Sequence, residues 1–194
     1  MSSIERDKEA ELVKRLRRSD PAAVQDLYNA YFDRLYSLVF NQVGRDHQTA
    51  EDIVQETFLA ALNSVSKFRG QSKLYTWLCS IARHKIVDFY RQQKREAKRG
   101  NQPLNIGSIE LDQIKSSELP VSDLMESKET HQAVERALFS LPPDYRQVLI
   151  LKYVEEMSVS EISQVMGRSS KSVEGLLTRA RKALRASLTS PGEG

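Results

Sequence analysis

The stretch from Met157 to Arg185 constrains the fold more than any other part of the chain. It begins with Ser158 and Glu161, a capping box whose side chains satisfy the free amides at the start of a helix. Apolar residues then recur at helical spacing, and Gly167 supplies the left-handed residue that commonly ends a helix. After a turn at residues 168–170, a second helix carries Val173, Leu177, Ala180 and Leu184 on one face. Two short helices joined by a tight turn predict a helix-turn-helix, whose second helix enters the major groove of DNA.

The second helix of this motif is basic on its outward side. If Val173 marks the buried face, helical geometry turns six residues outward or to the flanks: Lys171, Glu174, Gly175, Thr178, Arg179 and Lys182. Glu174 repels phosphates, so near DNA it must either accept a hydrogen bond from a cytosine amino group or orient a basic neighbour. The alternative is an ordinary two-helix corner with a solvated basic face.

Charge is strongly segregated along the chain, although the net charge is only +3. Residues 1–66 carry a net −3, residues 67–99 a net +8, residues 100–130 a net −4 and residues 131–194 a net +2. A basic block followed by an acidic stretch predicts two modules and a linker.

Composition excludes several classes of protein. The sequence has no long apolar segment, and its charged start is unlike a signal peptide. Cys79 is the one cysteine, so neither an internal disulfide nor a multi-cysteine zinc site can form. Its apolar neighbours indicate a buried structural thiol. We therefore expect a soluble cytoplasmic protein.

The first third of the chain is predicted to be helical throughout. Helices are expected over residues 4–17, from Pro21 (with Asp20 as its N-cap) to about Gly44, and over residues 48–66. The third of these has an apolar stripe and an opposite polar side with Glu51, Asp52, Gln55 and Glu56. That side is either a solvated acidic face or a docking surface for a basic partner.

Residues 67–95 mix basic and aromatic side chains. Gly70 is expected to turn the chain, and Ser72 to cap a following helix with Leu74, Leu78 and Ile81 on its buried stripe. Cations interleaved with aromatic residues are typical of a surface that binds single-stranded nucleic acid. Alternatively, most of these aromatics belong to the core, and Trp77 is expected to be buried.

The remaining segments complete an all-α architecture. Residues 100–126 have the composition of a flexible acidic linker. From Ser127 a second helical module begins, with one helix stopped before Pro142 and the next, opened by Pro143, carrying a stripe from Val148 to Tyr153. Residues 189–194 are expected to be a disordered tail. Neither His84 with Asp88 nor His47 with its acidic neighbours has a third ligand or nucleophile, so no enzyme and no metal site is predicted.

Three separated stretches together resemble an extracytoplasmic-function (group IV) sigma factor of bacterial RNA polymerase. AEDIVQETFLAAL at 50–62 is similar to sigma region 2.2, and FRGQSKLYTWLCSIARHKIVDFYR at 68–91 to regions 2.3 and 2.4. ALFSLPPDYRQVLILKYVEEMSVSEISQVMGRSSKSVEGLLTRARKALR at 137–185 is similar to region 4. Three positions depart from the family's usual pattern: Glu174 and Leu176 stand where basic residues are common, and His84 where Asn is frequent.

The resemblance implies a role for each surface. Residues 1–99 would form a region 2 domain that docks on the polymerase β′ clamp through Glu51, Asp52, Gln55 and Glu56. The same domain would capture the melted minus-ten element through Phe68, Arg69, Gly70, Ser72, Lys73, Tyr75, Arg83, Lys85 and Arg91. After the linker at 100–126, residues 127–188 would form a region 4 domain that contacts the β flap. It would read the minus-thirty-five duplex through Ser170, Lys171, Glu174, Gly175, Thr178, Arg179 and Lys182.

The resemblance also implies that the protein promotes promoter melting without a cofactor and without catalytic activity of its own. It implies an anti-sigma factor as a further partner. Two other functions fit part of the sequence. A helix-turn-helix regulator that is not a polymerase subunit explains residues 158–185 and leaves the basic-aromatic block unused. A protein-interaction module could use its basic face to bind an acidic protein.

Overall fold

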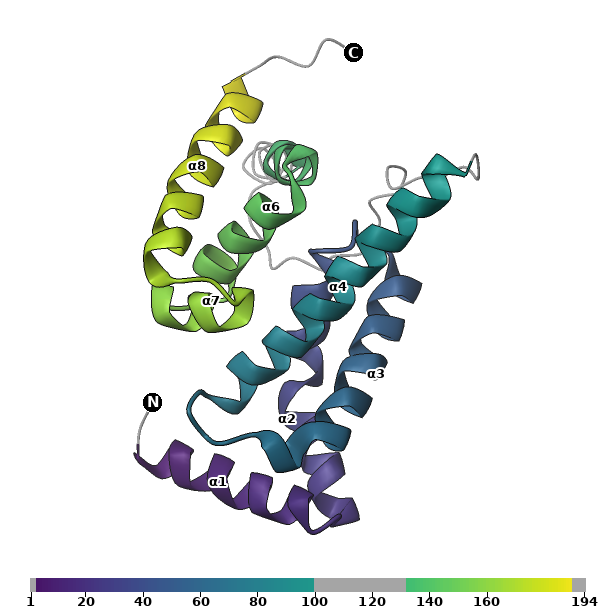
Figure 1. Cartoon of the computed structure of the whole chain (residues 1–194), viewed down its shortest axis with the longest axis vertical. Helices are drawn as coiled ribbons and strands as arrows, with labels where there is room; N and C mark the ends of the chain where they lie inside the picture. Colours follow the sequence, from purple (N-terminus) through teal and green to yellow (C-terminus); the bar gives the residue numbers. More distant parts are fainter. Residues whose placement is uncertain (1–2, 100–131, 190–194) are drawn as a thin grey trace, which may run out of the picture.

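The computed structural model describes residues 3–99 and 132–189, and the regular elements in these two ranges are all helices (Figure 1). The all-α prediction is confirmed. The predicted linker at 100–126 and the tail beyond Thr189 lie outside the described residues. We call residues 3–99 the N-terminal unit and residues 132–189 the C-terminal unit.

The N-terminal unit contains α1 (Ser3–Arg17), α2 (Pro21–Phe40), α3 (His47–Ser64), a short 3₁₀ turn η1 (Val65–Lys67) and α4 (Leu74–Lys98). Helices α2, α3 and α4 pack side by side, and α1 lies across one end of them (Figure 1). As predicted, Asp20 caps α2, its Oδ1 accepting the amide of Ala22 at 3.0 Å. The helix ends at Phe40, before the predicted Gly44, and the chain continues in turns in which Gly44 and Arg45 adopt left-handed backbone conformations.

Apolar residues from all four helices fill the centre of the N-terminal unit. Leu27, Leu35, Val54 and Leu78 are almost completely buried there. Cys79 is 1% exposed, and this burial raises the pKa of its thiol to about 12. The prediction that Cys79 is a buried thiol is therefore confirmed.

The C-terminal unit begins with helical residues 132–140 and continues with α6 (Pro143–Leu149), the π-helical turn η2 (Ile150–Val154), α7 (Val159–Met166) and α8 (Ser170–Thr189). Ser158 and Glu161 form the predicted capping box at the start of α7. Gly167 ends α7 with a φ of +61°. The hydroxyl of Ser169 accepts the amide of Ser172 at 3.2 Å, so α8 begins one residue earlier than expected. The helix-turn-helix is confirmed.

The π turn at Ile150 changes which residues face inward. The amide of Glu155 donates to the carbonyl of Ile150 at 3.0 Å, a five-residue step that widens the helix. The predicted stripe holds for Val148, Leu149 and Leu151, which are buried. It is wrong for Tyr153, which is 56% exposed, because the wider turn rotates later residues away from their α-helical positions.

The two units pack against each other through α4 and α7. Figure 1 shows α7 and α6 lying along one side of α4, while α3 covers its other side. The buried apolar residues of both units form one continuous cluster. The charge pattern of the sequence predicts two modules joined by a linker, but it does not indicate that the modules pack against each other.

Candidate nucleic-acid and protein interfaces

The predicted docking residues lie together on the outer side of α3. Glu51, Asp52, Gln55 and Glu56 are all exposed, while Val54 and Phe58 on the opposite side are buried. Asp52 accepts a hydrogen bond from the side chain of Gln48 at 3.1 Å. Glu56 forms an ion pair with Lys85 of α4 at 2.8 Å. Helix α3 thus presents a continuous acidic face, with one end joined to α4.

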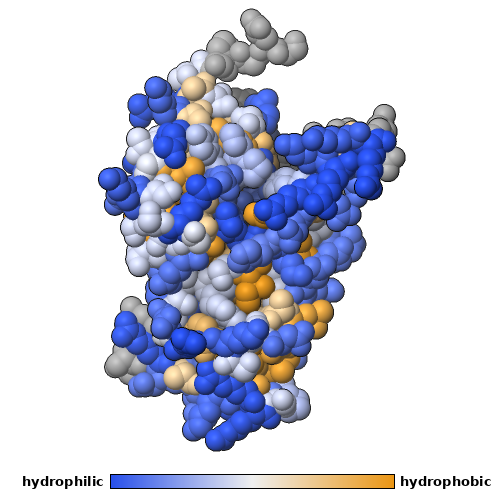
Figure 2. Space-filling view, viewed as in Figure 1, coloured by the Kyte–Doolittle hydropathy of each residue, from blue (hydrophilic) through white to orange (hydrophobic). Residues whose placement is uncertain are grey.

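An apolar residue that the sequence analysis missed extends this face. Leu59, one turn after Gln55 and Glu56, is 62% exposed. Figure 2 shows hydrophobic surface over the C-terminal part of α3, surrounded by hydrophilic surface. A single exposed leucine is ordinary, but an apolar patch bordered by charges is typical of an interaction site. The signal in the sequence was a leucine at a position that the helical pattern assigns to the polar side.

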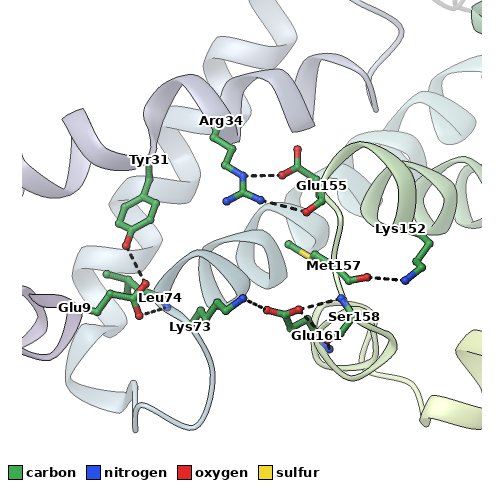
Figure 3. Close-up of polar contacts among 10 residues, drawn as sticks. All are labelled: Glu9, Tyr31, Arg34, Lys73, Leu74, Lys152, Glu155, Met157, Ser158 and Glu161. Atoms are coloured by element: carbon green, nitrogen blue, oxygen red, sulfur yellow. Dashed lines mark hydrogen bonds and ion pairs between the residues drawn. The ribbon is translucent and has the colours of Figure 1, made fainter. Parts of the chain in front are cut away.

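The loop before α4 is formed largely as expected. Arg69 and Gly70 are exposed, and Gly70 adopts a φ of +69° with open space around it. The prediction that Ser72 caps α4 is wrong. The amide of Leu74 instead donates to the Glu9 carboxylate of α1 at 3.2 Å, a long-range cap that sequence spacing cannot reveal (Figure 3).

Two aromatic residues expected on the minus-ten surface are buried. Phe68 is 7% exposed and packs 5.0 Å from Trp77, and Arg17 of α1 donates to the Phe68 carbonyl group. Tyr75 is 5% exposed and lies under the guanidinium group of Arg34 at 4.0 Å. Neither ring has a free face for stacking on a base in this structure. Trp77, which was expected to be buried, is half-buried.

The cations assigned to the minus-ten strand on α4 and at its N-cap, Lys73, differ in what they face. Arg91 is exposed and pairs with Asp88 of its own helix at 3.2 Å, and the end of α4 projects as a hydrophilic arm (Figure 2). Lys73 and Arg83 instead face the C-terminal unit. Burial lowers the pKa of the Arg83 guanidinium, whose side chain is 16% exposed.

The outer face of α8 is open to solvent. Ser170, Lys171, Glu174, Thr178, Arg179 and Lys182 are exposed, and Gly175 is half-buried. The guanidinium group of Arg179 lies 3.6 Å from where a Cβ atom on Gly175 would stand, so the absent side chain leaves room for it. Leu176, which stands where a basic residue is common, is 3% exposed and belongs to the core.

Five polar contacts between side chains join the C-terminal unit to α2 and to residues 73–83, at the start of α4. Glu155 is 7% exposed; its carboxylate accepts from Arg34 at 2.9 Å and from the Tyr75 hydroxyl at 2.8 Å. Lys73 pairs with Glu161 at 2.7 Å (Figure 3). Arg83 donates to Gln147 at 3.0 Å and lies 3.7 Å from Asp144. None of these contacts was predicted, because each joins residues more than sixty positions apart.

A sixth link is buried more deeply. Arg146 of α6 is 6% exposed and donates to the Gln42 carbonyl at 3.1 Å and to the Tyr90 hydroxyl at 3.0 Å. Its guanidinium group also donates to three carbonyl groups at the end of the helical segment 132–140, those of Leu138, Phe139 and Leu141. Arg146 therefore holds its own unit together and ties it to the N-terminal unit.

Within the described residues, no group of three or more His, Cys, Asp or Glu side chains is arranged to hold a metal ion. His84 is exposed, and its expected neighbour Asp88 pairs with Arg91. His47 contacts the Tyr36 hydroxyl through its Nδ1 atom at 2.6 Å. The helices described here include none that is long and apolar enough to cross a membrane.

Comparison with known proteins assigns both units. The family Sigma-70 region 2 matches residues 27–96, and the family Sigma-70, region 4 matches residues 131–184. RNA polymerase sigma factor YlaC of Bacillus subtilis is 32% identical over 174 residues, which cover 88% of this chain and 95% of YlaC. ECF RNA polymerase sigma factor SigW of the same organism is 29% identical over 177 residues, 91% of this chain and 94% of SigW. The ECF RNA polymerase sigma-E factor of Salmonella typhimurium is 31% identical over 178 residues, 89% of this chain and 90% of the relative.

Two solved structures share the fold. CnrH, in complex with the cytosolic domain of CnrY, matches with a TM-score of 0.66 and 23% identity over 95% of this chain and 99% of CnrH. The sigma factor RpoE from Bartonella quintana, in complex with the anti-sigma factor NepR, matches with a TM-score of 0.67 and 22% identity over 87% of this chain and 98% of RpoE.

An all-α chain with a region 2 unit followed by a region 4 unit is a sigma factor of RNA polymerase. This chain belongs to the extracytoplasmic-function sigma factors, the specificity subunits that bind core polymerase and direct it to promoters. A helix-turn-helix regulator that is not a polymerase subunit is not favoured, because the region 2 match would then be unexplained.

Proposed function

We propose that this sigma factor uses three separate surfaces. The acidic face of α3 docks on core polymerase, and the loop before α4 binds the melted minus-ten strand. Helix α8 reads the minus-thirty-five duplex. The observation that carries the proposal is the exposed outer face of α8, presented by a capped and tightly turned α7. That geometry leaves a basic helix free to enter a major groove.

Docking on core polymerase is assigned to Glu51, Asp52, Gln55 and Glu56, with Leu59 beside them. An acidic face bordered by an exposed leucine suits a basic partner with an apolar contact, since charge steers the encounter and apolar burial adds affinity. The partner that the family implies is the β′ clamp, with the β flap as the contact of the C-terminal unit.

A charge reversal at Asp52 tests the docking role. Asp52→Arg places a like charge against a basic partner, so we expect roughly tenfold weaker binding to core polymerase in a fluorescence anisotropy titration. The matched control is Asp33→Arg, which reverses an exposed carboxylate on α2. If both variants bind core polymerase as tightly as the unsubstituted protein, the acidic face of α3 is not the docking surface.

The minus-ten surface is assigned to the nine residues named from the sequence, but their parts differ. Arg69, Gly70 and Arg91 are exposed and available to a strand, whereas Lys73, Tyr75 and Arg83 contact the C-terminal unit. Lys85 is tied to Glu56, and Phe68 supports the loop from within. Cations that follow a backbone suit single-stranded DNA.

The minus-thirty-five surface is assigned to the seven residues of α8, and Glu174 decides how it reads sequence. If the Glu174 carboxylate accepts from a cytosine amino group, Glu174→Gln changes the preferred base at one position, because the amide can also donate. Discrimination at that position should change by about 1–3 kcal/mol. A selection from randomised minus-thirty-five duplexes measures the preference. An unchanged preference with altered affinity would assign Glu174 to positioning a neighbouring cation.

Three further assignments complete the proposal. The chain works without catalytic activity or a cofactor of its own, in the cytoplasm where core polymerase acts. Its domains are residues 1–99 and 127–188, joined by a linker at 100–126. An anti-sigma factor controls it, as the complexes of CnrH with CnrY and of RpoE with NepR suggest.

A further inference from the structure

Some of the contacts between the two units fall on the surface assigned to the minus-ten strand. Lys73, Tyr75 and Arg83 each meet a residue of the C-terminal unit. The groups that meet them include three carboxylates, those of Glu161, Glu155 and Asp144. Part of the surface assigned to the strand is thus paired with anionic side chains of the same molecule, while the Lys73 side chain remains 46% exposed.

The Glu155 carboxylate is the most buried of the three. Its side chain is 5% exposed and accepts from both Arg34 and Tyr75, while Arg34 also donates to the Glu155 carbonyl at 3.2 Å (Figure 3). A buried carboxylate is costly unless hydrogen bonds compensate it. This arrangement is therefore stable only while the units are together.

The three carboxylates lie outside α8, the helix predicted to read duplex DNA. Asp144 lies in α6, where it also pairs with Arg168, Glu155 follows η2, and Glu161 lies in α7. The outer face of α8 stays exposed in the same structure. Closure thus occupies Lys73, Tyr75 and Arg83 of the minus-ten surface and leaves the rest of that surface and the minus-thirty-five surface open.

We propose that the free sigma factor is autoinhibited by its own C-terminal unit, whose Asp144, Glu155 and Glu161 carboxylates occupy the minus-ten surface and exclude a DNA strand. This inference rests on the proposed function of that surface. Full engagement of a strand requires the units to separate, which frees Lys73, Tyr75 and Arg83 from these partners together. The molecule consequently binds single strands weakly until a ligand that prefers the separated arrangement increases the fraction of molecules in that arrangement.

The test neutralises two carboxylates that lie outside every proposed DNA and polymerase surface. The double variant Asp144→Asn, Glu155→Gln keeps side-chain size and leaves the Glu161 cap of α7 intact. The control is Glu156→Gln, which removes a charge beside Glu155 from an exposed side chain that forms no hydrogen bond or ion pair with the N-terminal unit in the described residues. Circular dichroism verifies that helical content is unchanged in each variant.

The first measurement reports closure. Spin labels on Asn63→Cys and Ala186→Cys, one exposed site in each unit, give the distance between the units by electron–electron double resonance. The buried Cys79 stays unlabelled. We expect one narrow distribution for the otherwise unsubstituted protein and for Glu156→Gln, and a broad, longer one for the double variant.

The second measurement reports masking, with a dye-labelled twelve-nucleotide single strand of mixed sequence as the probe. Because apparent affinity scales with the competent fraction, we expect roughly three- to tenfold tighter binding by the double variant and less than about twofold by Glu156→Gln. An unchanged distance distribution overturns the proposal, and so does separation of the units without a gain in affinity.

The two measurements also keep this inference apart from the function it rests on. If the opened variant and the unsubstituted protein bind the strand equally well, masking fails while the single-strand role stands. If the opened variant does not bind the strand at all, the single-strand role itself fails, whatever the distances show.

Discussion

Phe68 and Arg69 are adjacent in the sequence but have opposite environments. The Phe68 ring packs inside the N-terminal unit against Trp77, and the Arg69 side chain extends into solvent. Loss of the first should therefore affect stability, and loss of the second should affect binding.

We predict that Phe68→Ala lowers the free energy of unfolding by about 3–5 kcal/mol, because it removes a buried ring and leaves a cavity. Arg69→Ala should change stability by less than about 0.5 kcal/mol and weaken binding of a single-stranded oligonucleotide. Urea unfolding and anisotropy titrations measure the two effects. A Phe68→Ala protein of normal stability that loses strand binding would show that the ring contacts bases after all.

The burial of Phe68 and Tyr75 could not be predicted from the local sequence, for a physical reason. Periodicity identifies which residues of one helix share a face, but Phe68 lies in a loop, where no period applies. Tyr75 is covered by Arg34 and Glu155, and the second of these belongs to the other unit. When a side chain is covered by a segment far away in the sequence, the residues next to it show no pattern that would predict its burial.

At the scale of single elements, Glu161 of α7 has two roles: it completes the capping box of its own helix and forms an ion pair with Lys73 of the other unit. Burial alone would raise the pKa of Glu161. Contacts with Lys73 and with the amide and hydroxyl of Ser158 outweigh it and hold that pKa at about 2, below the ordinary value of 4.5. The capping box was predictable from the sequence, whereas the bond to Lys73 of the other unit was not.

The lowered pKa makes the stability of this region depend on pH. A folded-state pKa below the unfolded value stabilises the protein above about pH 4.5, and the contribution is lost as the pH falls toward 2. We predict that Glu161→Gln costs about 1–3 kcal/mol of unfolding free energy at pH 6 and much less at pH 2.5. The control is Glu174→Gln, on an exposed side chain. An equal cost at both pH values would contradict a stabilising Glu161 carboxylate.

The π turn η2 is the element that the sequence could not reveal. Its residues, Ile150 to Val154, continue a good α-helical stripe, and a switch to five-residue hydrogen bonding has no simple sequence signature. The wider turn exposes Tyr153, and it ends at Glu155, whose carboxylate reaches Arg34. One irregular turn thus creates the contact on which the closed arrangement depends.

For the whole molecule, the sequence allowed prediction of the helical class, most helix boundaries, the helix-turn-helix and the outward faces of α3 and α8. These depend on periodicity, caps and turn residues, which act over a few positions. The packing of one unit on the other depends on pairs such as Lys73 with Glu161, whose members are far apart in sequence and were each assigned another role. Charged residues predicted to meet DNA or polymerase can equally well meet each other.

Arg146 allows this packing to be tested by unfolding. Its side chain bonds the Gln42 carbonyl and the Tyr90 hydroxyl of the N-terminal unit, and carbonyl groups of its own unit. Because the two units also share one apolar cluster, we expect the unsubstituted protein to unfold in one cooperative transition. Differential scanning calorimetry should then give equal calorimetric and van't Hoff enthalpies.

Arg146→Met keeps an elongated side chain but removes the Arg146 hydrogen bonds to the Tyr90 hydroxyl of the N-terminal unit and to the Phe139 and Leu141 carbonyl groups of its own unit. Each group that loses this donor costs about 1–3 kcal/mol, and more of them lie in the C-terminal unit, so that unit should melt first. We predict two transitions, with the lower one shifted down by on the order of 10 °C. Arg136→Met, on an exposed side chain of the same unit, is the control and should keep the single transition. Two transitions in the unsubstituted protein would show that the units are not coupled, and a single unshifted transition in Arg146→Met would show that Arg146 does not couple them.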